Sequence, residues 1–444
     1  MPPDENPTDL LDLEDPDDDL LDEHLSGEDD EFDDEDDEDR AVPEYLDHEL
    51  DDDRFDDEDD GEDDEDDTAR GGRGGRMLKW AAALGVLVLL AGGSYFGAVE
   101  LLGLGYEDYE GTGEADVVVA VEEGDVTSAI GATMAEQDVV ASSEAFVEAS
   151  EDDERVLSVQ PGYYHMKTKM SGEAAVARLV AESSRVGHVQ VRAGTQLSDV
   201  TQPDDSVTPG VFTLLSQATC ADLNGEDTCV SAEALSKAAD EADLGELGVP
   251  AWAESMAANA ERGHTLEGLV APGVYDVKPG WSAEQVLAEV LTASATHLEA
   301  AGLPSSAGST PFSPYQILII ASIIEREAVR SDFATVSSVI HNRLADGMPL
   351  QMDSTVNYLL DEPELTTADE DRFKDGPYNT YSTEGLPPTP IASPSQEAIE
   401  AALEPEDTDY KYFVKCEENG LSCFAESHEE HNANVVDARE RGIF

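Results

Sequence analysis

The chain has 444 residues, of which 102 are Asp or Glu and only 24 are Lys or Arg, so its formal net charge is -78. A surface of this sign repels phosphates, and we therefore expect no nucleic-acid partner. The length allows two or three domains, but the acidic residues are concentrated near the N-terminus, and we do not expect the whole chain to fold.

Residues 1–69 are dominated by runs of Asp and Glu and contain few aromatic side chains. Such a segment cannot bury enough apolar surface to offset the entropy lost on ordering, so we predict a disordered acidic tail. A solvated spacer is the favoured interpretation of this tail. Scattered apolar residues such as Leu10, Leu20 and Phe32 leave a docking arm as the alternative.

A stretch without any charged residue follows, from Trp80 to Val99. Its length is what a hydrocarbon core of about 30 Å requires, so we predict a transmembrane helix over 80–100. The preceding segment 70–79 is basic, with Arg70, Arg73, Arg76 and Lys79, whereas acidic residues follow the span. By the positive-inside rule, the sequence predicts a single-pass cell-membrane protein with a cytoplasmic N-terminus and an extracellular C-terminal part.

Four cysteines form two pairs that are close in sequence, Cys220 with Cys229 and Cys416 with Cys423. In an oxidising compartment this spacing favours two local disulfides. The alternative for the second pair is a zinc site completed by His428 and His431, but the spacing does not follow a standard zinc signature. We therefore predict disulfides, no bound metal and no cofactor.

Beyond the predicted span, residues 115–200 alternate short apolar runs with segments of helical periodicity. Strands are predicted at Asp116–Val121 and Val156–Val159, and helices at Ser143–Ala149 and Gly172–Ala181. Strands and helices bounded by Gly or Pro indicate a small α+β module. Residues 201–264, rich in Ala, Asp, Glu and Ser, have helical character.

The strongest helix signal begins at Ser313, which is followed by Pro314 and, three residues on, by Gln316. Ser at the N-cap, Pro at the first helical position and Gln closing a capping box are typical of a helix start. The sequence then runs ILIIASIIEREAV, in which apolar residues cover most of the helix surface. We predict a largely buried core helix.

Two carboxylates, Glu325 and Glu327, stand at the end of this apolar run. Burial raises the pKa of a Glu, which suits a general acid near neutral pH. Helical periodicity places the two on opposite borders of the apolar face and does not choose between them. The alternative is an exposed ion pair with a nearby arginine, for which the candidates are Arg326, Arg330 and Arg343.

The segment after this helix is dense in Pro, Gly, Tyr, Asn and Gln, up to Pro394. Prolines at this density fix turns and extended backbone, so we predict shaped, rigid loops. Their polar side chains suit sugar hydroxyls and acetamides, or alternatively brace the loops themselves.

Several motifs in this region occur in a fixed order: ASIIEREA from Ala321, NRL from Asn342, LQMDSTVNY from Leu350, YNTY from Tyr378 and GLPPTPIASP from Gly385. In this order the chain resembles the YceG-like family of membrane-anchored endolytic murein transglycosylases. The resemblance is strongest over residues 313–436 and continues more weakly upstream.

The resemblance implies a LysM-like subdomain over 115–200, a divergent segment over 201–264 and a YceG-like catalytic domain over 265–440. It implies that Glu325 is the catalytic acid. It also assigns to the wall of a substrate cleft Gln351, Asp353, Tyr378, Asn379 and Tyr381.

The implied reaction cleaves the bond between N-acetylmuramic acid and N-acetylglucosamine and leaves a 1,6-anhydro end. Peptidoglycan glycan strands are then the substrate, the plasma membrane holds the anchor, and cell-wall synthesis proteins are candidate partners. The alternative is a non-catalytic peptidoglycan-binding or scaffold protein, in which Glu325 is an ion-pair partner.

Overall fold

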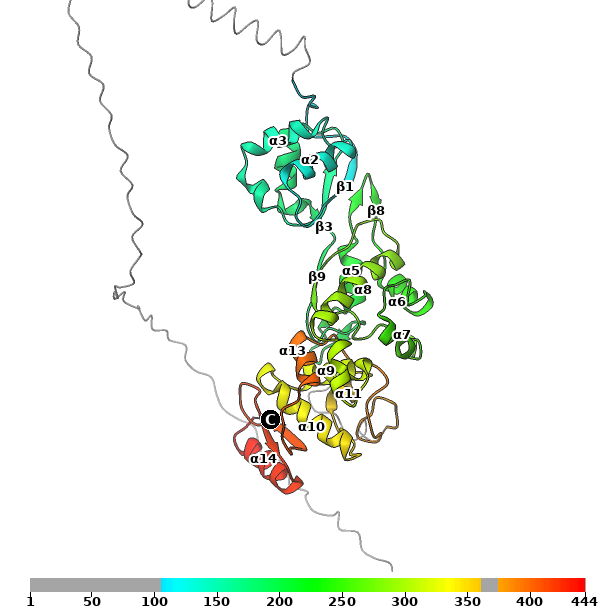
Figure 1. Cartoon of the computed structure of the whole chain (residues 1–444), viewed down its shortest axis with the longest axis vertical. Helices are drawn as coiled ribbons and strands as arrows, with labels where there is room; N and C mark the ends of the chain where they lie inside the picture. The colour runs from blue at the N-terminus through cyan, green and yellow to red at the C-terminus, as the bar shows by residue number, and fades with distance from the viewer. Residues whose placement is uncertain (1–104, 361–373, 444) are drawn as a thin grey trace, which may run out of the picture. The chain divides into compact units, whose positions relative to one another are not determined.

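The computed structural model describes residues 105–360 and 374–443 (Figure 1). The predicted acidic tail 1–69, basic segment 70–79 and transmembrane helix 80–100 lie outside the described residues. Among the helices of the described ranges, none combines the length and the apolar character needed to cross a bilayer.

The first part of the described chain is a small module built around a three-stranded antiparallel sheet of order β1-β2-β3. Asp116 pairs with Lys167 at one end of the β1–β2 ladder. Ser142 and Ser171 cap two of its helices by accepting from backbone N–H groups. The elements are β1 (Asp116–Val121), α2 (Thr127–Glu136), α3 (Ser143–Glu151), β2 (Gly162–Lys167), α4 (Gly172–Leu179), η2 (Glu182–Ser184) and β3 (Arg185–Val186).

Three of the four elements predicted for this module are confirmed, and one is wrong. The strand expected at Val156–Val159 is a 3₁₀ helix, η1 (Glu154–Ser158). The Asp153 side chain accepts a hydrogen bond from the backbone N–H of Arg155 at 3.1 Å, which favours a local turn over strand pairing. Val156 is buried in the core of the module whereas Leu157 is 82% exposed, and the segment adds no strand to the β1-β2-β3 sheet.

The second part of the chain is mainly helical, with short antiparallel hairpins. Strand β4 (His188–Val191) pairs with β9 (Gly273–Asp276), although 81 residues separate them, from residue 191 to residue 273. The other elements are β5 (Val200–Thr201), β6 (Val207–Thr208), α5 (Val211–Ala218), β7 (Asp222–Leu223), β8 (Glu226–Asp227), α6 (Ala232–Glu241), α7 (Ala251–Ala257), α8 (Ala283–Ala300), η3 (Ser305–Ser309), α9 (Pro314–Glu327), η4 (Arg330–Asp332), α10 (Phe333–Ala345), α11 (Asp353–Asn357), α13 (Gln396–Leu403), β10 (Tyr412–Lys415), β11 (Ser422–Ala425) and α14 (His428–Glu440).

Helix α9 lies at the centre of this part, in contact with α7, α10, α11 and α13 (Figure 1). The predicted start is confirmed: Ser313 and Gln316 form both hydrogen bonds of a capping box, and Pro314 is the first helical residue. Nearly every residue from Tyr315 to Ile324 is buried, so the prediction of a core helix is also confirmed. The helix ends at Glu327, where the chain turns extended.

Buried apolar side chains form two separate clusters. The smaller runs from Val119 to Leu179, and the larger runs from Val189 to Leu403. Segment 188–200 therefore packs with the larger cluster, through Val189, Val191 and Leu197. Residues 201–264 also contribute to that cluster.

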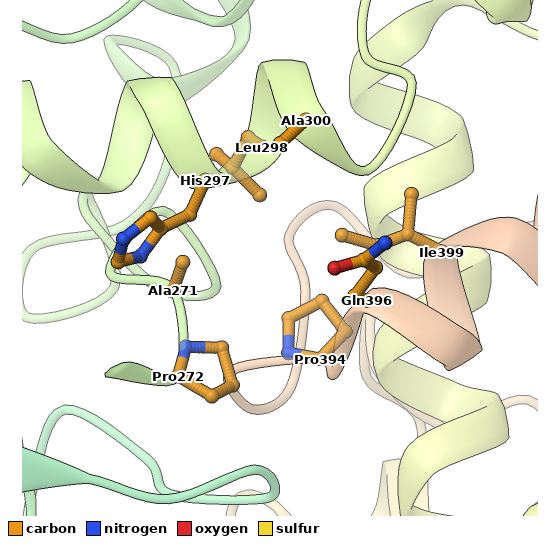
Figure 2. A pocket seen from close by; sticks show the side chains of 8 residues that line it. All are labelled: Ala271, Pro272, His297, Leu298, Ala300, Pro394, Gln396 and Ile399. Carbon is orange, nitrogen blue, oxygen red and sulfur yellow. The ribbon is translucent and has the colours of Figure 1, made fainter. Parts of the chain in front are cut away.

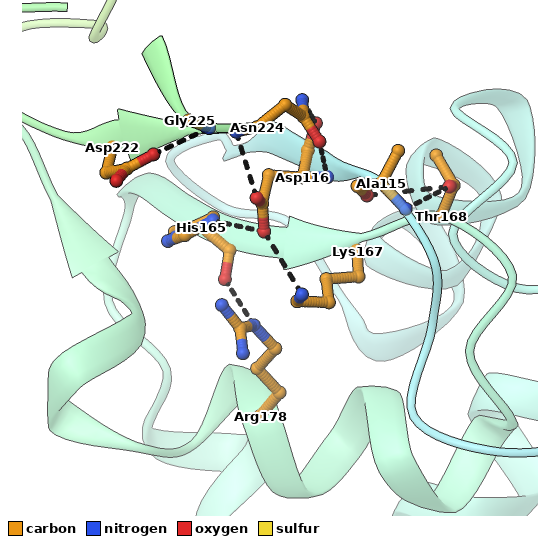
Figure 3. Close-up of polar contacts among 9 residues, drawn as sticks. All are labelled: Ala115, Asp116, His165, Lys167, Thr168, Arg178, Asp222, Asn224 and Gly225. Carbon is orange, nitrogen blue, oxygen red and sulfur yellow. Dashed lines mark hydrogen bonds and ion pairs between the residues drawn. The ribbon is translucent and has the colours of Figure 1, made fainter. Parts of the chain in front are cut away.

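A hairpin from the second part, β7–β8, contacts strand β1 (Figure 3). Asn224 and Asp116 exchange two backbone-to-side-chain hydrogen bonds of 2.7 and 3.0 Å. Burial by itself would raise the pKa of Asp116, but hydrogen bonds from Asn224 and His165 and the charge of Lys167 hold it below its usual value. Asn224 adopts a left-handed conformation, φ 59°, which Asn tolerates better than most residues.

Both cysteine pairs are bonded in the structure. The Cys220–Cys229 disulfide closes the β7–β8 hairpin, and the Cys416–Cys423 disulfide links the residue that follows β10 to strand β11. The sulfurs that would have served a zinc site with His428 and His431 are therefore bonded to each other.

Candidate active site

Glu325 lies near the C-terminal end of α9 and is partly exposed. Its Oε2 accepts hydrogen bonds from the backbone N–H of Ser395, at 3.0 Å, and from the Ser395 hydroxyl. Within the described ranges, the structure shows no hydrogen bond to Oε1. The carboxyl group is thus fixed through one oxygen, and the other can meet a ligand.

Glu327 lies two residues further on and faces a different element. Its Oε1 accepts from the backbone N–H of Ser354 in α11 at 3.1 Å. Burial raises the pKa of Glu327, and the charge of Asp353 adds to this, while the hydrogen bonds from Ser354 and the charge of Lys415 oppose it. The carboxyl of Glu327 therefore joins α9 to α11, whereas that of Glu325 meets the start of α13.

The exposed ion pair considered for these two residues is not formed with any of the three arginines. Arg330 pairs with Glu397 at 2.8 Å, and Arg326 contacts the carbonyl of Gly194 at 3.4 Å. Arg343 is 6% exposed and donates to backbone carbonyls instead.

Arg343 shapes the loop that leads from α10 to α11. Its Nη1 donates to the carbonyls of Pro349 and Leu350, at 2.9 and 2.8 Å, and to Oε1 of Gln351 at 3.0 Å. Its Nε donates to the carbonyl of Lys411. One guanidinium therefore holds three carbonyls and places Gln351 beside α11.

Of the five residues predicted for the cleft wall, Gln351, Asp353 and Tyr381 reach the surface. Gln351 is exposed and has a left-handed backbone, φ 55°. The Tyr381 hydroxyl donates to Oδ1 of Asp353 at 2.5 Å, next to the Ser354 that binds Glu327. These residues meet around the C-terminal end of α9.

The other two are buried and bind within the protein. Tyr378 is 1% exposed, and its hydroxyl hydrogen-bonds Oγ1 of Thr389 at 2.7 Å. Asn379 is 6% exposed and donates to the carbonyl of Lys374 at 2.6 Å. Its Oδ1 accepts from the backbone N–H of Tyr381 at 2.9 Å, so Asn379 positions the loop that carries Tyr381.

Two cavities lie among the described residues, and the first of them is next to Ser395. One of about 220 Å³ is lined by Pro394 and Gln396, which flank Ser395, and by His297 and Ile399 (Figure 2). The other, of about 400 Å³, is lined by Glu267 among other residues. Glu267 was not singled out from the sequence, although a lone acid between Leu266 and the apolar pair Leu269–Val270 was a visible signal.

Ser395 was also missed as a site residue. The available signal was local: Ser395 precedes the amphipathic segment Gln396–Leu403 and caps it, accepting from the backbone N–H of Ala398 at 3.2 Å. Its contact with Glu325 joins residues 70 positions apart, and sequence patterns do not report such a distance.

The fold and the site together define a mixed helix-and-sheet protein with a carboxyl group held at the end of a buried core helix, beside polar loops and cavities. The chain belongs to the YceG-like family, whose model matches residues 119–437.

Two relatives carry the name endolytic murein transglycosylase. The one from Bacillus subtilis (strain 168) is 29% identical over 349 residues, which cover 78% of this chain and 89% of the relative. The one from Streptococcus pneumoniae serotype 2 (strain D39 / NCTC 7466) is 28% identical over 362 residues, which cover 79% of this chain and 63% of the relative.

A 2.6 Å crystal structure of the yceG-like protein lmo1499 from Listeria monocytogenes is also similar. It matches with 26% identity and a TM-score of 0.44, over 72% of this chain and 98% of that one.

Proposed function

We propose that this protein is an endolytic peptidoglycan lytic transglycosylase with Glu325 as its catalytic acid. The observation that carries the proposal is the fixed geometry of Glu325, whose Oε2 is held by Ser395 while Oε1 is open to a ligand. Membership of the YceG-like family and two relatives named endolytic murein transglycosylase support the activity and the substrate.

In the first step, Glu325 Oε1 gives its proton to the oxygen that links N-acetylmuramic acid to N-acetylglucosamine, and the bond from that oxygen to the muramyl C1 breaks. The N-acetylglucosamine side leaves with a free hydroxyl. In the second step, the muramyl 6-hydroxyl bonds to C1 and returns its proton to the Glu325 carboxylate. The product is a 1,6-anhydro end, and the enzyme regains its starting protonation state.

No water is consumed, because the attacking hydroxyl belongs to the substrate. Glycosidases that hydrolyse need a second carboxyl group to activate water or to attack C1. Here one carboxyl group serves in turn as acid and as base.

Around Glu325, we assign Gln351, Asp353 and Tyr381 to the wall that binds the glycan. All three side chains reach the surface near the end of α9 and offer amide, carboxylate and phenol groups to sugar hydroxyls. Tyr378 and Asn379 are buried behind this wall and stabilise it through hydrogen bonds within the loop between residues 374 and 389.

The small module is assigned as LysM-like. The order β1, α2, α3, β2, with antiparallel pairing of the two strands, supports this assignment. In this assignment the module is a second glycan-binding site of the protein.

We propose that the protein lies in the cell membrane, with residues 80–100 as a single span and the site outside the cell. The support is the uncharged stretch from Trp80 to Val99 and the basic residues before it. Such an anchor holds the site near newly made glycan strands and the cell-wall synthesis proteins that produce them.

The test is to incubate the purified full-length protein with peptidoglycan sacculi and to identify the soluble products by mass spectrometry. Muropeptides that end in 1,6-anhydro-N-acetylmuramic acid are expected. Products with reducing ends would make the enzyme a hydrolase. No soluble product at all would favour the non-catalytic binding protein.

A further inference from the structure

Glu267 is a buried carboxyl group that the proposed reaction does not use. It is 2% exposed. Its Oε2 accepts from the Tyr358 hydroxyl at 2.8 Å and from the backbone N–H of Leu197 at 3.3 Å. Its Oε1 is buried and has no hydrogen-bond partner among the residues that the structure describes. An acceptor in this state is costly to bury unless a ligand supplies a donor.

A short hydrogen-bonded chain supports Glu267. The Tyr358 hydroxyl that donates to Glu267 also lies 2.6 Å from Nδ1 of His264. Because the single hydroxyl proton is given to Glu267, Nδ1 of His264 is the donor in the second bond. Tyr358 directly, and His264 through Tyr358, thus fix the orientation of the Glu267 carboxyl group and of its unpaired oxygen.

These three side chains line one side of the cavity of about 400 Å³. Its volume falls within the range of about 300–1,000 Å³ that is usual for small-molecule sites. Gln196, Ser198 and Asp199 line it as well, and none of the described residues that line it is Lys or Arg. The cavity therefore offers acceptors and two carboxyl groups, and it disfavours anionic ligands.

The cavity is connected to the Glu325 site through one backbone segment. Gly194 donates to the carbonyl of Ser393, and Ser393 donates to the carbonyl of Thr195, both at 2.8 Å. Ser393 is two residues before the Ser395 that holds Glu325. From Thr195 the chain continues directly into Gln196 and the wall of the cavity.

We propose that this cavity is a saccharide subsite for a neutral N-acetylhexosamine unit, whose acetamide N–H donates to Oε1 of Glu267. The inference rests on the proposed function, because it makes the cavity a place for one unit of the glycan whose cleavage Glu325 catalyses. The acidic lining repels the carboxylates of the peptide that N-acetylmuramic acid units carry. We therefore expect the bound unit to be N-acetylglucosamine.

The protonation behaviour of Glu267 agrees with this assignment. Burial raises its pKa to about 7, although hydrogen bonds from Tyr358, Leu197 and Gly268 and the charge of Arg326 oppose the rise. The donor that would offset burial at Oε1 is missing, and an acetamide N–H would provide it.

Binding is measured on the full-length protein carrying Glu325→Gln, so that no cleavage occurs. The probes are chitotetraose, a tetramer of N-acetylglucosamine, and cellotetraose, the same tetramer without acetamides, each titrated by isothermal calorimetry. Adding Glu267→Gln should weaken chitotetraose binding by about tenfold or more and leave cellotetraose binding unchanged. In this variant position 267 keeps an amide oxygen that accepts the hydrogen bonds from Tyr358 and Leu197. The NH₂ group of the amide then faces the acetamide N–H of the ligand, and two donors cannot form a hydrogen bond with each other.

The matched control is Ser294→Ala. It removes a buried hydroxyl that forms hydrogen bonds with Ala271 and Tyr275, and Ser294 does not line the cavity of about 400 Å³. It should leave the affinity for both probes unchanged. Equal weakening of both probes by Glu267→Gln would overturn the acetamide contact, and unchanged chitotetraose affinity would overturn the subsite.

A second variant tests the cavity without changing a buried charge. Ser198 is exposed at the cavity wall, so Ser198→Trp can fill the space without disturbing the core. It should weaken chitotetraose binding at least as much as Glu267→Gln does, while the unfolding midpoint stays unchanged. Full binding by this variant would overturn the subsite even if Glu267→Gln failed to fold.

The two proposals can fail separately. Sacculi that yield no anhydro-muropeptides, together with chitotetraose binding that depends on Glu267, would remove the transglycosylase activity and leave the subsite. Anhydro-muropeptides together with binding that is indifferent to Glu267 would remove the subsite alone.

Discussion

Ser395 donates to one oxygen of Glu325 from both its backbone nitrogen and its hydroxyl, although 70 residues separate the two. The same hydroxyl accepts from Ala398 and so caps α13. Ser395 therefore joins the end of α9 to the start of α13 and holds the Glu325 carboxyl group between them.

Replacing Glu325 with Gln should lower the cleavage of sacculi by about 10²–10⁴-fold, because a carboxamide has no acidic proton to give. The rate is measured as the release of anhydro-muropeptides, and the thermal unfolding midpoint should not change. The control is Glu327→Gln, whose amide oxygen can still accept from Ser354. An equal loss of cleavage from Glu327→Gln alone would show that Glu327 is the acid.

Replacing Ser395 with Ala should have two separable effects. Loss of the α13 cap should lower the free energy of unfolding by about 1 kcal/mol. Loss of the hydroxyl bond to Glu325 should also reduce kcat by about tenfold, since the carboxyl group is then held by one donor instead of two. Ser395→Thr keeps the hydroxyl and should restore both quantities.

A matched control separates stability from positioning. Ser231 caps α6 with the same geometry, its hydroxyl accepting from the backbone N–H of Ala234 at 3.2 Å. Ser231→Ala should therefore cost about the same stability and leave kcat unchanged. A similar fall in kcat for both variants would mean that Ser395 acts only through stability.

Helix α9 could be predicted from the sequence because everything that determines its start is local. Ser313, Pro314 and Gln316 lie within one turn, and the apolar run after them has no competing signal. The strand expected at Val156–Val159 failed for the opposite reason. Apolar composition indicated burial, and Val156 is indeed buried, but composition did not show that the Asp153 side chain caps a local 3₁₀ turn.

The site could be predicted only in part. Periodicity placed Glu325 and Glu327 on opposite borders of α9, and in the structure they do meet different elements, α13 and α11. Periodicity could not predict which residues from distant segments contact these two carboxyl groups. Ser395 contacts Glu325, 70 residues away in sequence, and Glu267 contacts Tyr358, 91 residues away. A single sequence does not show that such distant residues are neighbours in space.

Arg343 should be among the residues most sensitive to replacement. It is buried and donates to the carbonyls of Pro349, Leu350 and Lys411, and its guanidinium lies 5.0 Å from the ring centroid of Tyr412. A Lys ammonium cannot reproduce this set of directions. Arg343→Lys should lower the free energy of unfolding by about 3 kcal/mol, measured by urea titration.

The control for this variant is Arg330→Lys. Arg330 is 72% exposed, and its pair with Glu397 is open to solvent. Its replacement should change the free energy of unfolding by less than about 0.5 kcal/mol. If Arg343→Lys were equally mild, the loop between residues 346 and 351 would not depend on the guanidinium.

Glu267 should make the stability of the protein depend on pH. Its pKa is about 7 in the folded protein and near 4.5 in an unfolded chain, so between these values the folded state keeps a proton that the unfolded state has lost. The contribution of Glu267 to the free energy of unfolding must therefore fall as the pH rises from about 4.5 to 7 and level off above. The contribution of this one group is at most about 3–4 kcal/mol, because its pKa differs by about 2.5 between the two states and one pKa unit corresponds to about 1.4 kcal/mol.

The measurement is urea unfolding of the wild type and of Glu267→Gln at pH 5, 6, 7 and 8. Because Gln does not titrate, the variant should lose most of the decrease between pH 5 and pH 7. A remaining slope of the same sign is expected from Glu327, whose pKa burial also raises. Ser294→Ala, a buried change without a titrating group, should keep the full wild-type decrease. If Glu267→Gln kept it as well, Glu267 would not be the buried acid that titrates near neutral pH.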